Sequence, residues 1–490
     1  MTEPEQETGV LFPSVDGRRS TQTTARAVFA DATRSVAPEV AIAIERSGNW
    51  HKDYVRHLGE IERVSAGSAK SPTIIATEGL HALHERMVFA RDGEEVELAH
   101  ALDRWQQPTF GTTTVAGEGG QPTGLAIPYQ GRELSGDALH RQLDNWVARG
   151  VMEPSCADAL RLVAAQPEWL DARDITVALV GAAAEMSPLP ALLRWGATVA
   201  AVDLPTPAVW DRITSAARAG SGRVIAPSTD GATPGADLLA QLPEIRSWLL
   251  GLEMPLVLGN YAYADGAMFV RVAAAADALT ADLVNGGTAR ALGYLASPTD
   301  VFAVPASIVD AARDGGGIKR RGRVIGTPLR AVTGGRMFTP SYQVVVDSDE
   351  GQRFGLADSV VPQQGPNYAL AKRMQRWRAV VARESVVTSA NVAPATKTKS
   401  VMKNRVLAAA YNGAGSFGVE VFETPTSSTL MAALLLHDLR NPVAAAHPDM
   451  ALSHPLELFC DQAAHGGLWR LPWEPRSVLP LAAIEGMIRR

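Results

Sequence analysis

The stretch ITVALVGAAA, residues 175–184, is a continuous apolar run that passes through Gly181. Such a run is typical of a β-strand buried on both faces of a parallel sheet, because a strand with one solvent-facing side alternates apolar and polar residues. The helix-like segment LPALLRWG follows at 189–196. A strand followed by a helix is the first half of a βαβ unit, so this stretch predicts an α/β fold with a parallel sheet.

The alternation of strands and helices continues on the C-terminal side of this stretch. Apolar runs predict further core strands at 197–205, 222–231, 254–266, 342–351 and 385–394. Helical spacing predicts helices over 208–219, about 236–250, 268–284, 367–382 and 428–440. This order is typical of a doubly wound, Rossmann-like parallel sheet, in which helices cover both faces.

Differences in character along the chain predict a division into three parts. Residues 1–35 are polar and lack sustained periodicity, which predicts a flexible tail. Residues 36–172 repeat apolar side chains mostly at helical spacing, which predicts a mostly helical N-terminal domain. Residues 173–490 form the predicted Rossmann-like domain, with an insertion at about 290–340 that contains a glycine triplet and basic residues.

The composition limits the classes of function. Hydrophobic residues make up 46% and charged residues 20% of the 490 residues, which excludes a disordered chain. The net charge of −6 gives no reason to expect nucleic acid or an anionic membrane surface as a partner. We therefore expect the partner to be a small-molecule substrate.

Targeting and metal-binding signals are also missing from the sequence. The acidic, polar start MTEPEQETGV lacks the basic residues and apolar run of a secretory signal. The two cysteines are too few for a zinc framework or a disulfide scaffold. The apolar run at 430–436 is much shorter than the roughly 20 residues that cross a bilayer. These features predict a cytoplasmic protein without a membrane span and without a metal.

The first βα turn is the expected nucleotide site, because the N–H groups at a helix N-terminus favour a pyrophosphate. Gly181 is the first glycine of this turn, while Glu185 and Ser187 stand where a second and a third glycine would be. Asp203 ends the second predicted strand, where an acid accepts hydrogen bonds from a ribose 2′-OH and repels a 2′-phosphate. This predicts NAD as the cofactor, with NADP less favoured; Asp203 as a helix cap before Pro205 is the alternative.

Tyr368 and Lys372 lie one helical turn apart on a predicted helix. A lysine ammonium beside a tyrosine favours the phenolate form, which makes the tyrosine a proton donor and acceptor near neutral pH. An ordinary helix with a buried tyrosine and an exposed lysine is the alternative.

With these residues, the segment from about 174 to 440 resembles the short-chain dehydrogenase/reductase superfamily. The Tyr-x-x-x-Lys signature of the family matches Tyr368 and Lys372, and its proline and threonine after the following strand match Pro394 and Thr396. Asp230 resembles the acid that ends the third strand. The resemblance implies that Tyr368 is the general acid/base, that Lys372 tunes it and holds the nicotinamide ribose, and that Asp230 contacts adenine.

Two further positions follow from the resemblance. Asn260 stands for the asparagine-rich turn that follows the fourth strand of the family. A serine that polarises the substrate oxygen is expected at the end of the strand before the tyrosine. Ser348 has this strand context but lies 20 residues before Tyr368, while Ser359 is nearer but falls in a predicted loop. We take Ser348 as the candidate and Ser359 as the alternative.

These residues predict an NAD(P)-dependent oxidoreductase that transfers a hydride between the cofactor and a carbonyl or alcohol substrate of apolar or acyl type. A catalytically inactive, dehydrogenase-like binding or scaffold protein is an alternative, because Glu185 and Ser187 replace glycines. An S-adenosylmethionine-dependent methyltransferase is a third reading, but it leaves Tyr368 and Lys372 unexplained. Long helices at 268–284 and 367–382 leave a homodimer or a tetramer open.

Overall fold

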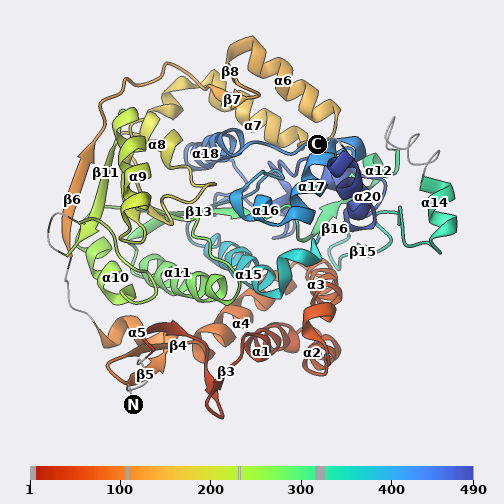
Figure 1. The fold of residues 1–490 in the computed structure, drawn as a ribbon, viewed down its shortest axis with the longest axis horizontal. Helices are drawn as coiled ribbons and strands as arrows, with labels where there is room; N and C mark the ends of the chain where they lie inside the picture. Colours follow the sequence, from red (N-terminus) through yellow and green to blue (C-terminus); the bar gives the residue numbers. More distant parts are fainter. Residues whose placement is uncertain (1–6, 106–109, 230, 232, 315–325, 489–490) are drawn as a thin grey trace.

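A seven-stranded sheet forms the centre of the computed structural model, which describes residues 7–105, 110–229, 231, 233–314 and 326–488 (Figure 1). The strand order is β17-β13-β12-β9-β10-β11-β6. All neighbours pair in parallel except β6, which pairs antiparallel with β11. The strands are β6 (Gly111–Ala116), β9 (Thr176–Val180), β10 (Thr198–Val202), β11 (Arg223–Ser228), β12 (Leu256–Asn260), β13 (Ala289–Ala296) and β17 (Val387–Val392). The predicted α/β fold around a mostly parallel sheet is confirmed.

The first strand, β9, is buried on both faces, as its continuous apolar run predicts. Ala178 and Val180 belong to one hydrophobic cluster, and Val177 and Leu179 belong to a second cluster. Adjacent side chains of a strand point to opposite faces, so the two clusters lie on the two sides of the sheet. Full burial of each Val or Leu side chain stabilises the fold by about 1.5–3 kcal/mol.

The first of these clusters lies under three helices and the N-terminal segment. These helices are α10 (Leu242–Leu250), α11 (Ala267–Asn285) and α15 (Gly365–Ala382). Outside them lie α1 (Thr21–Arg34), α2 (Pro38–Glu45), α3 (Trp50–Ala66), α4 (Ser71–Arg86) and α5 (Leu98–Arg104), together with the small sheet β1 (Gly9–Leu11), β4 (Val88–Arg91) and β5 (Glu94–Glu97) (Figure 1).

The second cluster lies under α8 (Leu189–Arg194), α9 (Pro207–Ala219) and α18 (Thr424–Arg440). The outer layer on this face is formed by α6 (Gly136–Ala148), α7 (Pro154–Ala165), the short 3-10 helix η1 (Pro167–Leu170) and the hairpin β7 (Ile127–Tyr129) and β8 (Arg132–Leu134). Residues 36–172 are therefore distributed over both faces of the sheet, and β6 extends its edge. The division of the chain into separate domains stays a prediction.

The predicted flexible tail at 1–35 is wrong for its described part. Residues 7–35 contain β1, the hairpin β2 (Ser14–Val15) and β3 (Arg18–Arg19), and helix α1. Ser20 caps α1 by accepting a hydrogen bond from the Thr23 N–H, and Val28 and Phe29 are buried in the core. Helix α1 is amphipathic, and its many polar residues made the helical spacing hard to recognise in the sequence. Its apolar side packs against α4.

The predicted insertion at about 290–340 is shifted along the chain. Residues 289–296 form the central strand β13, and the chain leaves the sheet only between β13 and α15. The predicted core strand at 342–351 is wrong. Its only strand residues form β15, which belongs to a separate three-stranded antiparallel sheet. The inserted elements are β14 (Val301–Pro305), α12 (Ala306–Asp314), α14 (Thr327–Val332), β15 (Val345–Asp347), β16 (Arg353–Asp358) and the 3-10 helix η3 (Pro362–Gln364).

The segment after β17 packs back over the sheet and its carboxyl end. It contains α16 (Lys399–Lys403), α17 (Arg405–Gly413), η4 (Ala414–Phe417), α18, α19 (Glu457–Cys460), η5 (Leu468–Arg470) and α20 (Pro475–Ile488). Helices α17 and α20 pack closely, since Gly413 and Gly486 face the backbone of the partner helix. Within the described residues, no helix combines the length and the apolar character that a bilayer span requires.

Candidate active site

A pocket of about 550 Å³ lies at the carboxyl ends of the parallel strands. Its lining includes Asn260 at the end of β12, Ser297 directly after β13, and Pro394 shortly after β17. Tyr368 and Lys372 line it from α15, and residues of α16 and α17 line it from the C-terminal segment. The carboxyl ends of parallel strands are where ligands bind in open α/β sheets, so this pocket is the candidate active site.

Tyr368 and Ser297 form the polar centre of the pocket. The Tyr368 hydroxyl donates a hydrogen bond of 3.0 Å to Ser297 Oγ. Ser297 Oγ lies 2.9 Å from Thr299 Oγ1, which donates to Gln364 Oε1 at 2.8 Å. Burial raises the pKa of Tyr368 to about 12, although the hydrogen bond with Ser297 acts in the opposite direction. The phenol is therefore neutral at pH 7 and can donate a proton.

Lys372 is held by partners other than Tyr368. Its Nζ donates to the Leu295 carbonyl at 3.2 Å and to Gln375 Oε1 at 2.9 Å. Burial lowers the pKa of Lys372 to about 8. The predicted phenolate form of Tyr368 is not favoured by this arrangement, because burial of the phenol outweighs any effect of the nearby ammonium.

Neither predicted serine lies in the pocket lining. Ser348 occupies the turn between β15 and β16, where its Oγ accepts a hydrogen bond of 3.2 Å from the Gln352 N–H. Ser359 is buried after β16, and its N–H donates to the Asp300 carbonyl at 3.1 Å. Ser297, which directly follows β13, is the serine that contacts Tyr368 in the structure. The strand-like run ALGYLAS at 291–297 could have revealed it.

Asn260, Pro394 and Thr396, the predicted cofactor contacts, line the pocket. Asn260 is buried, and its Oδ1 has no hydrogen-bond partner among the residues that the structure describes. A buried carbonyl oxygen without a partner costs free energy, so this amide is available to a ligand. Thr396 Oγ1 donates to the Pro394 carbonyl at 2.8 Å, which fixes the turn after β17.

The first βα turn departs from the predicted phosphate site. Gly181 has φ +78°, and a Cβ there would lie 2.5 Å from Ala262 Cα, so a glycine is required for close approach of the two turns. Ser187 is buried, and its Oγ accepts a hydrogen bond from the Leu189 N–H. Helix α8 begins only at Leu189 and has six residues, so it brings no long helix N-terminus to the pocket.

Asp203 also serves the turn itself. Its carboxylate accepts hydrogen bonds from the Ala183 N–H at 2.8 Å and the Leu204 N–H at 2.9 Å. Burial raises the pKa of Asp203, while these two bonds lower it. These two contacts are those of a capping carboxylate, which was the alternative role, rather than those of a carboxylate that is free to bind a ribose. The other predicted acid, Asp230, lies outside the described residues.

Two ion pairs connect α16 with the opposite side of the pocket. Glu185 accepts a hydrogen bond of 2.7 Å from the Lys399 N–H, and Lys399 Nζ lies 3.9 Å from the same carboxylate. Lys403 Nζ lies 4.0 Å from Asp265. All four residues line the pocket, so its entrance carries paired charges of both signs.

The residues at the Tyr368 end of the pocket fit the nicotinamide and ribose of a dinucleotide, whereas the first βα turn provides no glycine-rich phosphate loop. Asn260 offers an unpartnered amide oxygen at the pocket, and Tyr368, Ser297 and Lys372 are grouped where a reacting centre would lie. Glu185 adds a negative charge at the first turn, and the exposed Lys399 ammonium, 3.9 Å away, offsets it only in part.

No protein-family model matches the chain, and no curated protein matches it either. The functional assignment therefore depends on the geometry of the site.

Proposed function

We propose that this chain is a nicotinamide-dependent oxidoreductase of short-chain type, acting on a carbonyl or alcohol substrate. The observation that carries the proposal is the 3.0 Å hydrogen bond between Tyr368 and Ser297, with Lys372 one helical turn away. The order of the parallel strands supports it. Numbered along the chain, β11-β10-β9-β12-β13-β17 has the order 3-2-1-4-5-6 of a doubly wound, dinucleotide-binding sheet.

The side chains suit proton transfer to a substrate oxygen. In the reducing direction, this oxygen takes the place of Ser297 as the acceptor of the Tyr368 hydroxyl and accepts a second hydrogen bond from Ser297. Ser297 has a single proton, which it donates to Thr299 Oγ1 while Thr299 donates to Gln364, and donation to the substrate oxygen replaces that bond. When bound, the nicotinamide supplies the hydride.

NAD is the proposed cofactor, and NADP is less favoured. Asn260, Pro394 and Thr396 would hold its nicotinamide end, since they line the pocket beside Lys372. Gly181 would keep the first turn close to the pyrophosphate. Asp203, directly after β10, would repel a 2′-phosphate, even though its carboxylate also accepts the Ala183 and Leu204 N–H groups.

The proposed substrate is an apolar carbonyl or alcohol compound. Aromatic rings from three elements line the pocket around Tyr368, and they are supplied by Tyr263, Phe269 and Tyr411. The ring centroids of Phe269 and Tyr368 are 5.7 Å apart. Such a lining favours burial of an apolar group next to the reacting oxygen.

A binding or scaffold protein without turnover is the second candidate. The carboxylate of Glu185 in the first turn and the six-residue helix α8 favour it, because both weaken a pyrophosphate site. An S-adenosylmethionine-dependent methyltransferase accounts less well for the pocket, since it assigns no role to Tyr368 and Ser297.

Thermal unfolding with NADH, NADPH and S-adenosylmethionine tests the proposal. A ligand at 100 times its dissociation constant adds about 2.7 kcal/mol of stability if it binds only the native state. We expect the larger shift with NADH. Tyr368→Phe should keep the NADH shift and lose about 10²–10⁴-fold in the turnover of a carbonyl substrate. Absence of any NADH shift would favour the scaffold, and a shift with S-adenosylmethionine alone would favour the methyltransferase.

A further inference from the structure

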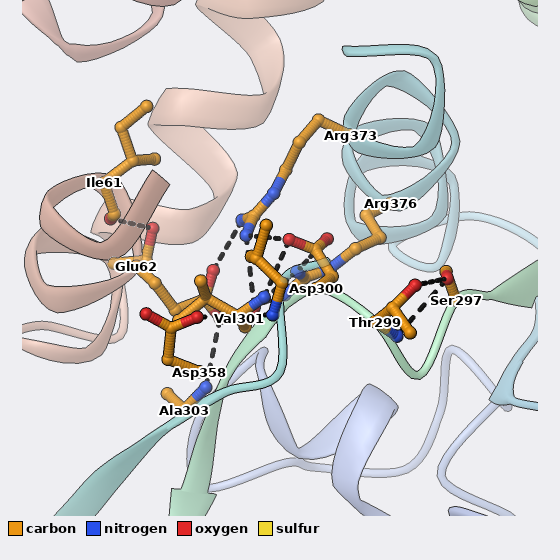
Figure 2. Close-up of polar contacts among 12 residues, drawn as sticks. Ile61, Glu62, Ser297, Thr299, Asp300, Val301, Ala303, Asp358, Arg373 and Arg376 are labelled. Carbon is orange, nitrogen blue, oxygen red and sulfur yellow. Dashed lines mark hydrogen bonds and ion pairs between the residues drawn. The ribbon is translucent and has the colours of Figure 1, made fainter. Parts of the chain in front are cut away.

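Four charged side chains form a closed, buried cluster beside the pocket (Figure 2). Arg373 contacts Glu62 at 2.5 Å and Asp300 at 2.8 Å, and Arg376 contacts both acids at 2.9 Å. The side chains of all four are at most 7% exposed. We call Glu62, Asp300, Arg373 and Arg376 the buried ion-pair cluster.

The buried ion-pair cluster is electrically balanced and rigidly held. Burial raises the pKa of Glu62 and Asp300, but the two guanidinium groups outweigh this and hold both pKa values below their ordinary range. The Arg376 guanidinium also lies over the Phe302 ring, 4.2 Å from its centroid. Each guanidinium bridges the two carboxylates with one hydrogen bond to each, and such charge-assisted bonds fix orientation as well as charge.

The buried ion-pair cluster binds the segment that follows Ser297. Asp300 is three residues after Ser297, and the Val301 carbonyl accepts hydrogen bonds from both arginines. The Ala303 N–H donates to Glu62 Oε1 at 3.1 Å. Figure 2 shows Ser297 and Thr299 on the turn that leads into this anchored segment.

The same cluster holds the helix that carries the tyrosine. Arg373 follows Lys372 directly on α15, and Tyr368 lies on the same helix. Glu62 comes from α3, more than 300 positions earlier in the chain. The Glu62 carboxylate thus contacts α15, which carries Tyr368, and β14, which follows Ser297. The separation of these two elements sets the distance from Tyr368 to Ser297.

We propose that Glu62 is a positioning residue for the Tyr368–Ser297 pair, so that the N-terminal helical segment completes the active site through the buried ion-pair cluster. The kinetic part of this inference rests on the proposed function. In this inference α3 positions active-site residues, in addition to enlarging the hydrophobic core.

A second cluster on α15 provides a matched control. Asp277 of α11 is buried and accepts two hydrogen bonds of 2.8 Å from Arg378, and His84 of α4 lies 2.8 Å from the same carboxylate. This cluster also joins the N-terminal segment to α15, but it has no contact with residues 297–303 among its described partners. Its loss should affect stability without moving Ser297.

The experiment compares wild type with Glu62→Gln, the double variant Glu62→Gln/Arg376→Gln, and Asp277→Asn. The double variant keeps the cluster neutral, which avoids an unpaired buried charge and keeps the protein folded. We expect its kcat to fall about 10- to 100-fold with KM within about twofold, because a shift of about 1 Å in a reacting group has an effect of this size. Asp277→Asn should keep the wild-type kcat at a temperature where it is folded.

Hydrogen–deuterium exchange of a peptide covering 295–303 gives a readout that needs no activity. We expect faster exchange in both Glu62 variants and wild-type exchange in Asp277→Asn. Unchanged exchange in the double variant would overturn the inference. A double variant with the stability and the kcat of wild type would also overturn it. If wild type neither binds NADH nor turns over a carbonyl substrate, the proposed function fails, and the exchange data still decide the role of Glu62.

Discussion

The Tyr368 hydroxyl donates a hydrogen bond of 3.0 Å to Ser297 Oγ although the two residues are 71 positions apart. The chain between them forms a separate antiparallel sheet and short helices before it returns to the central sheet as α15. The pairing therefore depends on how firmly this long excursion is anchored at both ends.

Ser297 and Ser348 distinguish the site seen in the structure from the one predicted from the sequence. We expect Ser297→Ala to lower kcat about 10²- to 10³-fold, because a hydrogen-bond donor to the substrate oxygen is lost. Ser348→Ala should leave kcat unchanged, since its hydroxyl contacts Gln352 and Glu350 in a turn outside the pocket. Steady-state kinetics with NADH and a carbonyl substrate measure both variants. A larger loss in Ser348→Ala would contradict the position assigned to Ser297.

Lys372 should make stability depend on pH. Burial lowers its pKa to about 8 in the folded protein, from an ordinary value of 10.5. Between these pH values the unfolded chain binds the proton and the folded chain does not, so stability rises with pH. Relative to Lys372→Met, the wild-type free energy of unfolding should increase by up to about 1 kcal/mol per pH unit from pH 8 to 10. Urea unfolding measures this, and parallel curves for the two proteins would refute it.

Glu185 should weaken dinucleotide binding. Its carboxylate stands in the first βα turn, close to the expected pyrophosphate. Glu185→Gln removes this charge but keeps an oxygen for the Lys399 N–H, so we expect the NADH dissociation constant to fall about three- to tenfold. Fluorescence titration at low salt measures it, with Asp449→Asn as a control on an exposed acid. Weaker binding in Glu185→Gln would mean that the carboxylate supports the bound state.

Gly181 should not tolerate a side chain. A Cβ at this position meets the Ala262 backbone at 2.5 Å, and φ +78° is unfavourable for other residues. We expect Gly181→Ala to destabilise the fold by roughly 1–3 kcal/mol. Gly120→Ala, where a Cβ meets nothing within 4 Å, should change stability much less. Thermal unfolding of both variants decides the matter, and equal melting temperatures would contradict the close approach of the two turns.

Most of the central sheet could be predicted from the sequence because buried parallel strands leave a simple signal. The runs around β9 and β10 are continuously apolar, those around β11, β12 and β17 are rich in apolar and β-branched residues, and helical segments separate them. Strand β13 was missed because Arg290, Gly293 and nearby prolines interrupt that signal, although its side chains are mostly buried. Strand β6 was missed because GTTTVA contains no apolar run, and its pairing with β11 reveals it.

Candidate residues of the pocket lining could be found in the sequence where a local pattern marked them, such as the strand end at Asn260. Tyr368 and Lys372 share a helix turn, and Pro394 and Thr396 share a loop, so spacing was sufficient. The position of Ser297 required knowledge of β13, and without this strand the nearest strand-like serine, Ser348, was chosen instead. Sequence spacing could not reveal the buried ion-pair cluster, because its members come from three distant segments.

The distance in sequence between Glu62 and Arg373, 311 positions, has a consequence for synthesis on the ribosome. At roughly 5–20 residues per second, α3 leaves the ribosome about 15–60 s before its arginine partners exist. During this time a helix that is to carry a buried carboxylate must stay hydrated, because an unpaired buried charge is costly. The contacts of Glu62 with Arg373 and Arg376 therefore form only after most of the chain has been made.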